Sequence, residues 1–196
     1  MHEREDTPAG AAQGQTADAA RSPALDPAQR AALEALYSHV EARAAALTSE
    51  RSAWPCRRGC DHCCRHLAAP LPVSGPEWAY LWEGFQQLAP SQQAQVRERV
   101  AQMAGAVRPY TCPLLDPATG ACSVYAHRPL SCRSYGFSVS RGEGNWCHLI
   151  AGMLAREGEE GLLWANQDAL EDTVRRLGGG TLTFFEWFAA HPPEGL

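Results

Sequence analysis

The sequence predicts an α+β fold that is mainly helical, with a small irregular core that carries a short β-hairpin and is flanked by helices. Three observations predict it. Apolar residues recur at three- and four-residue steps in several segments, as they do in amphipathic helices. Asp116-Pro-Ala-Thr-Gly120 has the composition of a turn between two short extended pieces. Eight cysteines, four of them between Cys56 and Cys64, occupy the remaining irregular chain.

Length and composition limit the classes of protein. A chain of 196 residues is expected to form one domain, here residues 25–196, preceded by a polar segment 1–24 that we expect to be disordered. The net charge of -5, the absence of lysine and the scattered arginines argue against a nucleic-acid partner. No apolar run approaches the roughly 20 residues of a membrane span, so no membrane association is expected.

Helix signals are clear in the first half of the chain. Asp26 is a predicted N-cap, and Pro27 suits the first position of a helix. Ser74 and Glu77 have the spacing of a capping box, and Pro90 begins a further helix that is expected to reach about residue 106. The apolar stripes of the first two helices are Leu33, Leu36, Tyr37, Val40, Ala44 and Leu47, then Trp78, Leu81, Trp82, Phe85 and Leu88.

The second half begins with the hairpin, which is expected to set Cys112 and Cys122 near one another across its mouth. An irregular stretch leads to Cys147. Helices are then predicted over residues 147–155 and 162–177, the second ended by three glycines at 178–180. The aromatic segment 182–190 is too apolar to be left in water and is expected to pack on the core.

The stretch Cys56-Arg-Arg-Gly-Cys60-Asp-His-Cys63-Cys64 indicates a metal site, because soft Zn²⁺ or iron takes several sulfur ligands from a sharply turning backbone. Gly59 can adopt the positive φ angle of such a turn. Cys60-x-x-Cys63 is the usual knuckle spacing for two sulfurs on one ion. Cys64 leaves the chain at another angle, which a second ion or a bridged cluster would use.

The candidate metal ligands are Cys56, Cys60, Cys63, Cys64, Cys112, Cys122, Cys132 and Cys147. Eight thiolates suffice for two four-sulfur zinc sites, or for one or two iron–sulfur clusters. The alternative is a disulfide framework, which also favours an even count. Such frameworks are typical of small secreted domains, whereas the N-terminus lacks the apolar run of a signal peptide. We therefore expect a cytoplasmic protein whose cysteines bind metal.

The order of the motifs resembles that of the YkgJ-like cysteine-cluster family (CxxCxxCC), described as zinc- or iron-chelating. The matching elements lie within residues 56 to 147: Cys56-x-x-Gly59-Cys60-x-x-Cys63-Cys64, Cys112-Pro-Leu-Leu115, Gly120-Ala-Cys122-Ser-Val-Tyr125, Arg128-Pro-x-x-Cys132-Arg133 and Cys147. The resemblance implies a metal centre and little about a reaction. Some flagellin lysine N-methylases have a similar cysteine pattern, but this chain is short for such an enzyme.

Other residues near the cysteines are weaker candidates. Nearby cations lower thiol pKa values, which gives Arg57, Arg58, Arg65 and Arg133 a possible electrostatic role beside the alternative of solvated surface charge. Arg128 is expected to pair with a carboxylate or a backbone carbonyl. Asp61 and Asp116 are candidate bases by proximity alone. The imidazoles that could replace a sulfur, although eight cysteines make none of them necessary, are His62, His66, His127 and His148.

The sequence thus predicts a metal-binding protein with a cysteine-ligated zinc or iron centre that holds the loops 56–64 and 110–133 and Cys147 together. An iron–sulfur protein or enzyme that transfers electrons is the first alternative. A zinc-stabilised adaptor that binds another protein is the second. No substrate or reaction is predicted.

Overall fold

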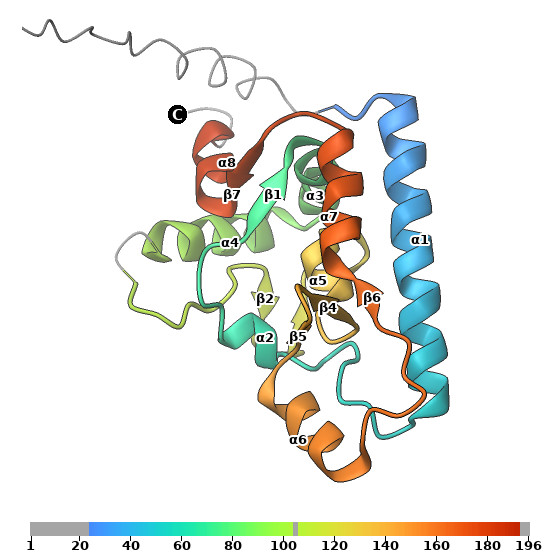
Figure 1. The fold of residues 1–196 in the computed structure, drawn as a ribbon. Helices are drawn as coiled ribbons and strands as arrows, with labels where there is room; N and C mark the ends of the chain where they lie inside the picture. The colour runs from blue at the N-terminus through green and yellow to red at the C-terminus, as the bar shows by residue number, and fades with distance from the viewer. Residues whose placement is uncertain (1–23, 104–105, 193–196) are drawn as a thin grey trace, which may run out of the picture.

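The computed structural model describes residues 24–103 and 106–192. The segment 1–24, predicted to be disordered, lies outside the described residues except for Ala24. The described part is mainly helical with small sheets, as predicted (Figure 1). Its helices are α1 (Pro27–Glu50), α2 (His62–Arg65), α3 (Gly75–Gln86), α4 (Pro90–Met103), α5 (Leu130–Ser134), α6 (His148–Glu157), α7 (Gln167–Arg176) and α8 (Phe184–Ala190), with a 3-10 turn η1 (Tyr125–His127).

The strands are short and form three small sheets. β2 (Leu115–Asp116) and β3 (Ala121–Cys122) make the predicted hairpin, with Leu115 opposite Cys122. β1 (Pro72–Ser74) pairs antiparallel with β7 (Thr181–Thr183). β4 (Ser138–Ser140) pairs antiparallel with β5 (Glu143–Asn145) and parallel with β6 (Ala165–Asn166). The last two sheets were not predicted, because two- and three-residue strands leave no periodic pattern.

The predicted helix starts are confirmed. The Asp26 side chain accepts hydrogen bonds from the backbone N–H groups of Ala28 at 2.8 Å and Gln29 at 2.9 Å, so α1 begins at Pro27. Ser74 and Glu77 form the complete capping box at the start of α3. α4 ends at Met103, slightly before the predicted limit.

The predicted helix over 162–177 is wrong in its first part. α7 begins only at Gln167, and β6 precedes it, with the N–H of Ala165 donating to the carbonyl of Phe137 at 3.1 Å. Leu162 and Trp164 are apolar because they pack beside Trp54 rather than along a helix face. Tertiary contacts therefore account for an apolar spacing that resembled a helix.

Three apolar clusters organise the described residues. The first joins α3 and α8 with the hairpin, and the predicted docking of the aromatic C-terminal segment is confirmed by Trp78 stacking on Trp187 at 5.7 Å between ring centroids. The second joins α1 with α5 and α7, and α1 and α7 run side by side in Figure 1. The third surrounds α6 and includes Trp54 and Ile150. Within the described ranges, no helix has the length and apolar character that crossing a membrane would need.

Candidate metal centre

All eight candidate cysteines border one cavity of about 420 Å³. They reach it from five places in the chain. The segment 56–64 carries four of them, Cys112 precedes the hairpin, Cys122 lies in β3, Cys132 lies in α5, and Cys147 is the N-cap of α6. All are free thiols, with Cys112 and Cys147 buried and the others half-buried. The fold therefore gathers residues that are distant in sequence around one space.

The first four cysteines are placed by a tight turn followed by one turn of helix. Gly59 has a φ of 91°, as predicted, and the N–H of Cys60 donates to the carbonyl of Arg57 at 3.0 Å. α2 then carries Cys63 and Cys64, whose sulfur atoms lie 4.0 Å apart. Neighbouring cysteines on a helix point in different directions, so the pair borders the cavity over a wider arc than one cysteine would.

Backbone pairing places Cys112 and Cys122 next to Cys64. Leu67 and Tyr110 exchange hydrogen bonds of 2.9 and 2.8 Å, and the N–H of Cys112 donates to the carbonyl of Cys64 at 2.6 Å. The hairpin register then brings Cys122 back opposite Leu115. These three cysteines pack against the first apolar cluster.

Cys56 and Cys147 lie on another side of the cavity, in the third apolar cluster. Cys147 is the N-cap of α6. Gly136, with a φ of 88°, allows the chain to pass Cys56 closely, because a Cβ atom there would lie 2.6 Å from the Cys56 sulfur. Reasoning from the sequence missed this contact, for which the glycine itself was the only signal.

The thiols are buried together, and this disfavours their charged form. Burial, reinforced by neighbouring thiolates, raises the pKa of Cys56 to about 12. The pKa of Cys64 is also raised to about 12, first by its sulfur hydrogen bond with Cys112 and also by burial. Burial raises the pKa of Cys132 as well. A nearby cation is needed to hold such thiols as thiolates, and several sulfur donors around one space suit zinc or iron.

Arg128 is an arginine whose charge acts on several of these thiols. Its guanidinium lies 3.6 Å from the ring centroid of Tyr125, donates to the carbonyls of Tyr125 at 3.0 Å and Cys132 at 3.4 Å, and its charge favours the thiolate form of Cys56, Cys122 and Cys132. The expected pairing with backbone carbonyls is thus present. The guanidinium of Arg58 lies 5.2 Å from the centroid of the same tyrosine ring, and its charge also favours the thiolate form of Cys122.

Arg133 and Arg65 have other partners, although both flank cysteines in sequence. Arg133 donates to the carbonyl of Arg128 at 2.7 Å and pairs with Glu41, with its guanidinium 4.1 Å from the Tyr37 ring. Arg65 pairs with Asp61. The spacing Tyr125-x-x-Arg128 on a 3-10 turn was the signal that would have distinguished Arg128 from its neighbours.

Comparison with protein families identifies the region that carries these cysteines. Residues 55–158, more than half of the chain, match the model of the family CxxCxxCC, described as "Putative zinc- or iron-chelating domain". The chain belongs to this family. Comparisons with curated proteins and with solved structures gave no significant match.

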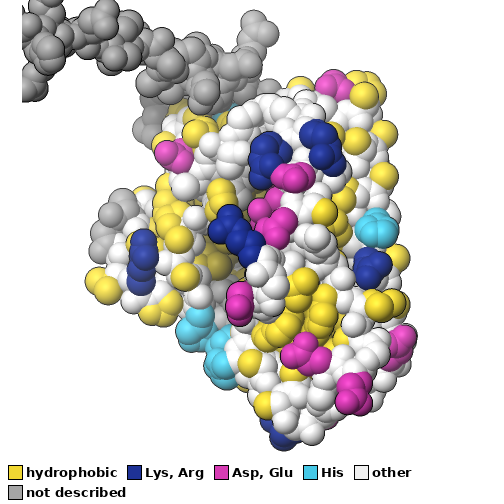
Figure 2. Space-filling model, viewed as in Figure 1, with side chains coloured by type: hydrophobic (Ala, Val, Ile, Leu, Met, Phe, Trp, Pro, Cys, Tyr) yellow, Lys and Arg dark blue, Asp and Glu magenta, His cyan; other side chains and the backbone are white. Residues whose placement is uncertain are grey.

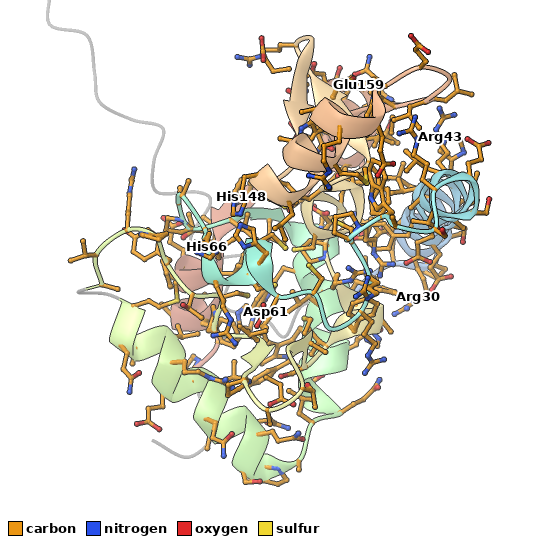
Figure 3. The ribbon with its side chains drawn as sticks, turned by 90° about the horizontal axis from the view of Figure 1, so that it is seen from below. Arg30, Arg43, Asp61, His66, His148 and Glu159 are labelled. Carbon is orange, nitrogen blue, oxygen red and sulfur yellow. The ribbon has the colours of Figure 1, made fainter. Side chains whose placement is uncertain are left out.

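Three histidines within the matched range 55–158 lie close together in the fold. The His62 ring lies 4.3 Å from that of His66 and 4.4 Å from that of His148, and His62 borders the cavity. Figure 2 shows histidine side chains gathered on the surface near α2, and Figure 3 shows His66 and His148 close together there. His127 lies elsewhere, against Tyr80 at 4.9 Å.

The two candidate bases, Asp61 and Asp116, both bind neighbouring groups of the protein. Asp61 pairs with Arg65, and Asp116 holds the hairpin turn by accepting from the N–H of Ala118 at 3.0 Å and the hydroxyl of Thr119 at 2.7 Å. The Thr119 hydrogen bond is the main cause that lowers the pKa of Asp116. Both carboxylates stabilise local structure.

The sulfur atoms surround the cavity rather than meet at one point. Among the residues that the structure describes, no three Cys, His, Asp or Glu side chains are arranged closely enough to hold an ion as they stand. A tetrahedral thiolate site has Zn–S bonds of ~2.3 Å, so coordination requires these side chains to turn inward. A cysteine sulfur is repositioned by rotation about one side-chain torsion, χ1.

Proposed function

We propose that the chain binds zinc or iron through its eight cysteines. The observation that carries this proposal is the single cavity bordered by all eight thiols, which five separate parts of the chain supply. Thiolates are preferred ligands of both metals. Membership of a family described as zinc- or iron-chelating supports it.

The bound metal has a structural consequence in this proposal. The segments that carry the thiols have short regular elements, such as the two-residue strands of the hairpin and the single turn of α2. A metal that ligates several such segments contributes its binding free energy to folding. Arg128 and Arg58 offset part of the thiolate charge. Thiols of this kind need a reducing compartment, so we propose a cytoplasmic location.

A second candidate is an iron–sulfur protein that transfers electrons. Apolar and aromatic side chains border the cavity together with the cysteines: Leu81, Leu114, Val124, Phe137 and Phe184. An apolar surround of this kind is one of the factors that set the reduction potential of a cluster. The zinc-stabilised adaptor stays a prediction from the sequence.

Anaerobic purification of the full chain tests both candidates. A structural zinc centre gives stoichiometric zinc and no visible absorption band, because Zn²⁺ has a filled d shell. An iron–sulfur centre gives a brown protein with iron and acid-labile sulfide that bleaches with dithionite. A folded protein that carries neither metal, with its cysteines paired as disulfides in the cell, would contradict the proposal.

A further inference from the structure

Three of the seven histidines of the chain meet beside the thiol cavity, where the proposed thiol centre does not use them. His62 is the first residue of α2, His66 is the C-cap of α2, and His148 is the first residue of α6. His62 is the middle one, since its ring contacts both of the others. Figure 3 shows that His66 and His148 lie on the same side of the molecule.

Two separate elements supply these rings. His62 and His66 are four residues apart, so the single turn of α2 and its C-cap present them on one face, where the rings stack. The start of α6 adds His148, whose ring meets that of His62 edge-on. Two histidines at this spacing on a helical turn form the first part of many zinc sites, and three histidines are one complete set of protein ligands for zinc.

A hydrogen bond of His66 decides which of its nitrogens is available to a metal. The Nδ1 atom of His66 lies 2.8 Å from the backbone carbonyl oxygen of His62. A carbonyl oxygen only accepts, so Nδ1 carries the proton and Nε2 of the neutral ring has the lone pair. Metal-binding histidines commonly donate their other ring N–H to a backbone carbonyl in this way. The ring is thus held in the tautomer that a metal ligand needs.

The ring separations are close to those of ligands that share an ion. With metal–nitrogen bonds of ~2.1 Å, two imidazoles have ring centres ~4.5 Å apart at a right angle and ~5 Å apart at the tetrahedral angle. The observed separations are 4.3 and 4.4 Å. As they stand the described side chains do not converge on an ion, so the rings must rotate. His66 and His148 are exposed, which leaves them room to do so.

We infer that His62, His66 and His148 form a second metal site, which takes a divalent transition-metal ion at the surface and is separate from the thiol cavity. Imidazole suits zinc, copper, nickel and iron. Three protein ligands leave a further coordination position for water, so the ion stays in contact with solvent. Because His62 also borders the cavity, the ion lies beside the thiols without being bound by them. The inference goes beyond the proposed function and does not depend on it.

Equilibrium dialysis against Ni²⁺ tests the site on the full chain, prepared without an affinity tag and purified anaerobically with its resident metal. Nickel is the probe because imidazole binds it well and because it is counted separately from zinc or iron. The wild type is expected to bind one added Ni²⁺ ion per chain and to keep its resident metal. No sulfur-to-nickel charge-transfer band should appear in its absorption spectrum.

Four variants locate the added ion. His66→Gln and His148→Gln each remove an exposed ligand, so each should weaken Ni²⁺ binding by about tenfold or more. His62→Gln should weaken it as well, and all three should keep the resident metal. His39→Gln is the matched control, because His39 is an exposed histidine of α1, and it should bind Ni²⁺ like the wild type. Circular dichroism of each variant checks that its fold is intact.

The outcomes separate this inference from the proposed function. Absence of added Ni²⁺ in the wild type, equal weakening in His39→Gln, or a sulfur-to-nickel band overturns the histidine site and leaves the thiol centre in place. Loss of resident metal in His62→Gln would make His62 a ligand of the thiol centre and overturns the separation of the two sites. A wild type without zinc or iron contradicts the proposed function instead, and Ni²⁺ that only the three histidine variants fail to bind still supports the histidine site.

Discussion

Arg128 sets the electrostatic environment of the thiols through its position and charge. Replacing it in Arg128→Gln removes a cation that favours the thiolate form of Cys56, Cys122 and Cys132. Changes in residues that surround metal ligands typically cost about 10- to 100-fold in metal affinity, and we expect a loss in that range. Competition with a chromophoric chelator measures it. Arg65→Gln is the matched control, because Arg65 follows Cys64 directly in the sequence but pairs with Asp61. Equal losses in the two variants would contradict the role of Arg128.

Asp168 connects α7 to the turn between β4 and β5. It accepts from the N–H of Arg141 at 2.9 Å and the hydroxyl of Ser140 at 2.8 Å, and these bonds lower its pKa. A lowered pKa in the folded state means that the stabilisation is complete above the ordinary value of about 3.9 and is lost as the pH falls through the folded-state pKa. Wild type should therefore exceed Asp168→Asn in urea midpoint at pH 6, and the gap should narrow below pH 4. A gap that is constant over this range would show that the carboxylate charge contributes nothing.

Glu77 joins three helices through one buried carboxylate. It caps α3 through Ser74, accepts from the N–H of Leu130 at the start of α5 at 2.7 Å, and contacts the Tyr37 hydroxyl of α1 at 3.4 Å. Glu77→Ala leaves these buried donors without a partner, so it should lower the free energy of unfolding by about 3 kcal/mol. The exposed capping box of α8 is the control, where Glu186→Ala should cost about 1 kcal/mol. Similar urea-unfolding losses in the two variants would contradict the joining role of Glu77.

Gly136 and Gly142 offer a matched pair in neighbouring turns. Both have positive φ, at 88° and 83°, so alanine at either carries a similar conformational cost of about 1–2 kcal/mol. A Cβ at Gly136 also meets the Cys56 sulfur at 2.6 Å, whereas at Gly142 nothing lies within 4 Å. Gly136→Ala should therefore reduce metal content, and Gly142→Ala should keep it at the wild-type level. Metal analysis of both purified variants checks this, and unchanged metal in Gly136→Ala would show that Cys56 is not held by this contact.

The elements that the sequence predicted correctly are those with local signals. Asp26 and the Ser74–Glu77 pair predict where their helices begin, because capping needs particular side chains at fixed spacing. The strands β4 to β6 gave no such signal. β4 and β5 are too short to show a period, and the pairing of β4 with β6 joins segments that lie far apart in sequence. Leu162 and Trp164 were misassigned because their contacts with Trp54 are also distant in sequence.

At the scale of the whole molecule, the sequence indicated which residues make the candidate site but not which parts of the core position them. Cysteine has few other uses at this density, so all eight could be named from the chain alone. Only the fold shows that Cys64, Cys112 and Cys122 pack with the first apolar cluster, and Cys56 and Cys147 with the third. The role of Arg128 depends likewise on the fold, since four other arginines lie as close to a cysteine in sequence.

In the proposed function the metal holds the thiol-bearing loops, whereas apolar packing holds the long helices. Removing the metal should therefore increase local unfolding in the loops and leave the helices protected. The thiol-bearing segments 56–66 and 110–123 are held by few backbone hydrogen bonds, so chelation should speed amide hydrogen exchange there. α1 and α3 should keep their protection, because Leu33 and Val40 are fully buried in the second cluster, which contains no cysteine, and Trp78 is fully buried against Trp187 and Phe188 of α8. Hydrogen–deuterium exchange read by mass spectrometry, with and without an anaerobic chelator, resolves these segments. The Cys60→Ser, Cys63→Ser double variant should resemble the chelated wild type within 56–66. Equal loss of protection in α1 and α3 would mean that the metal is needed for the whole core, and unchanged exchange in 56–66 would mean that it does not hold this loop.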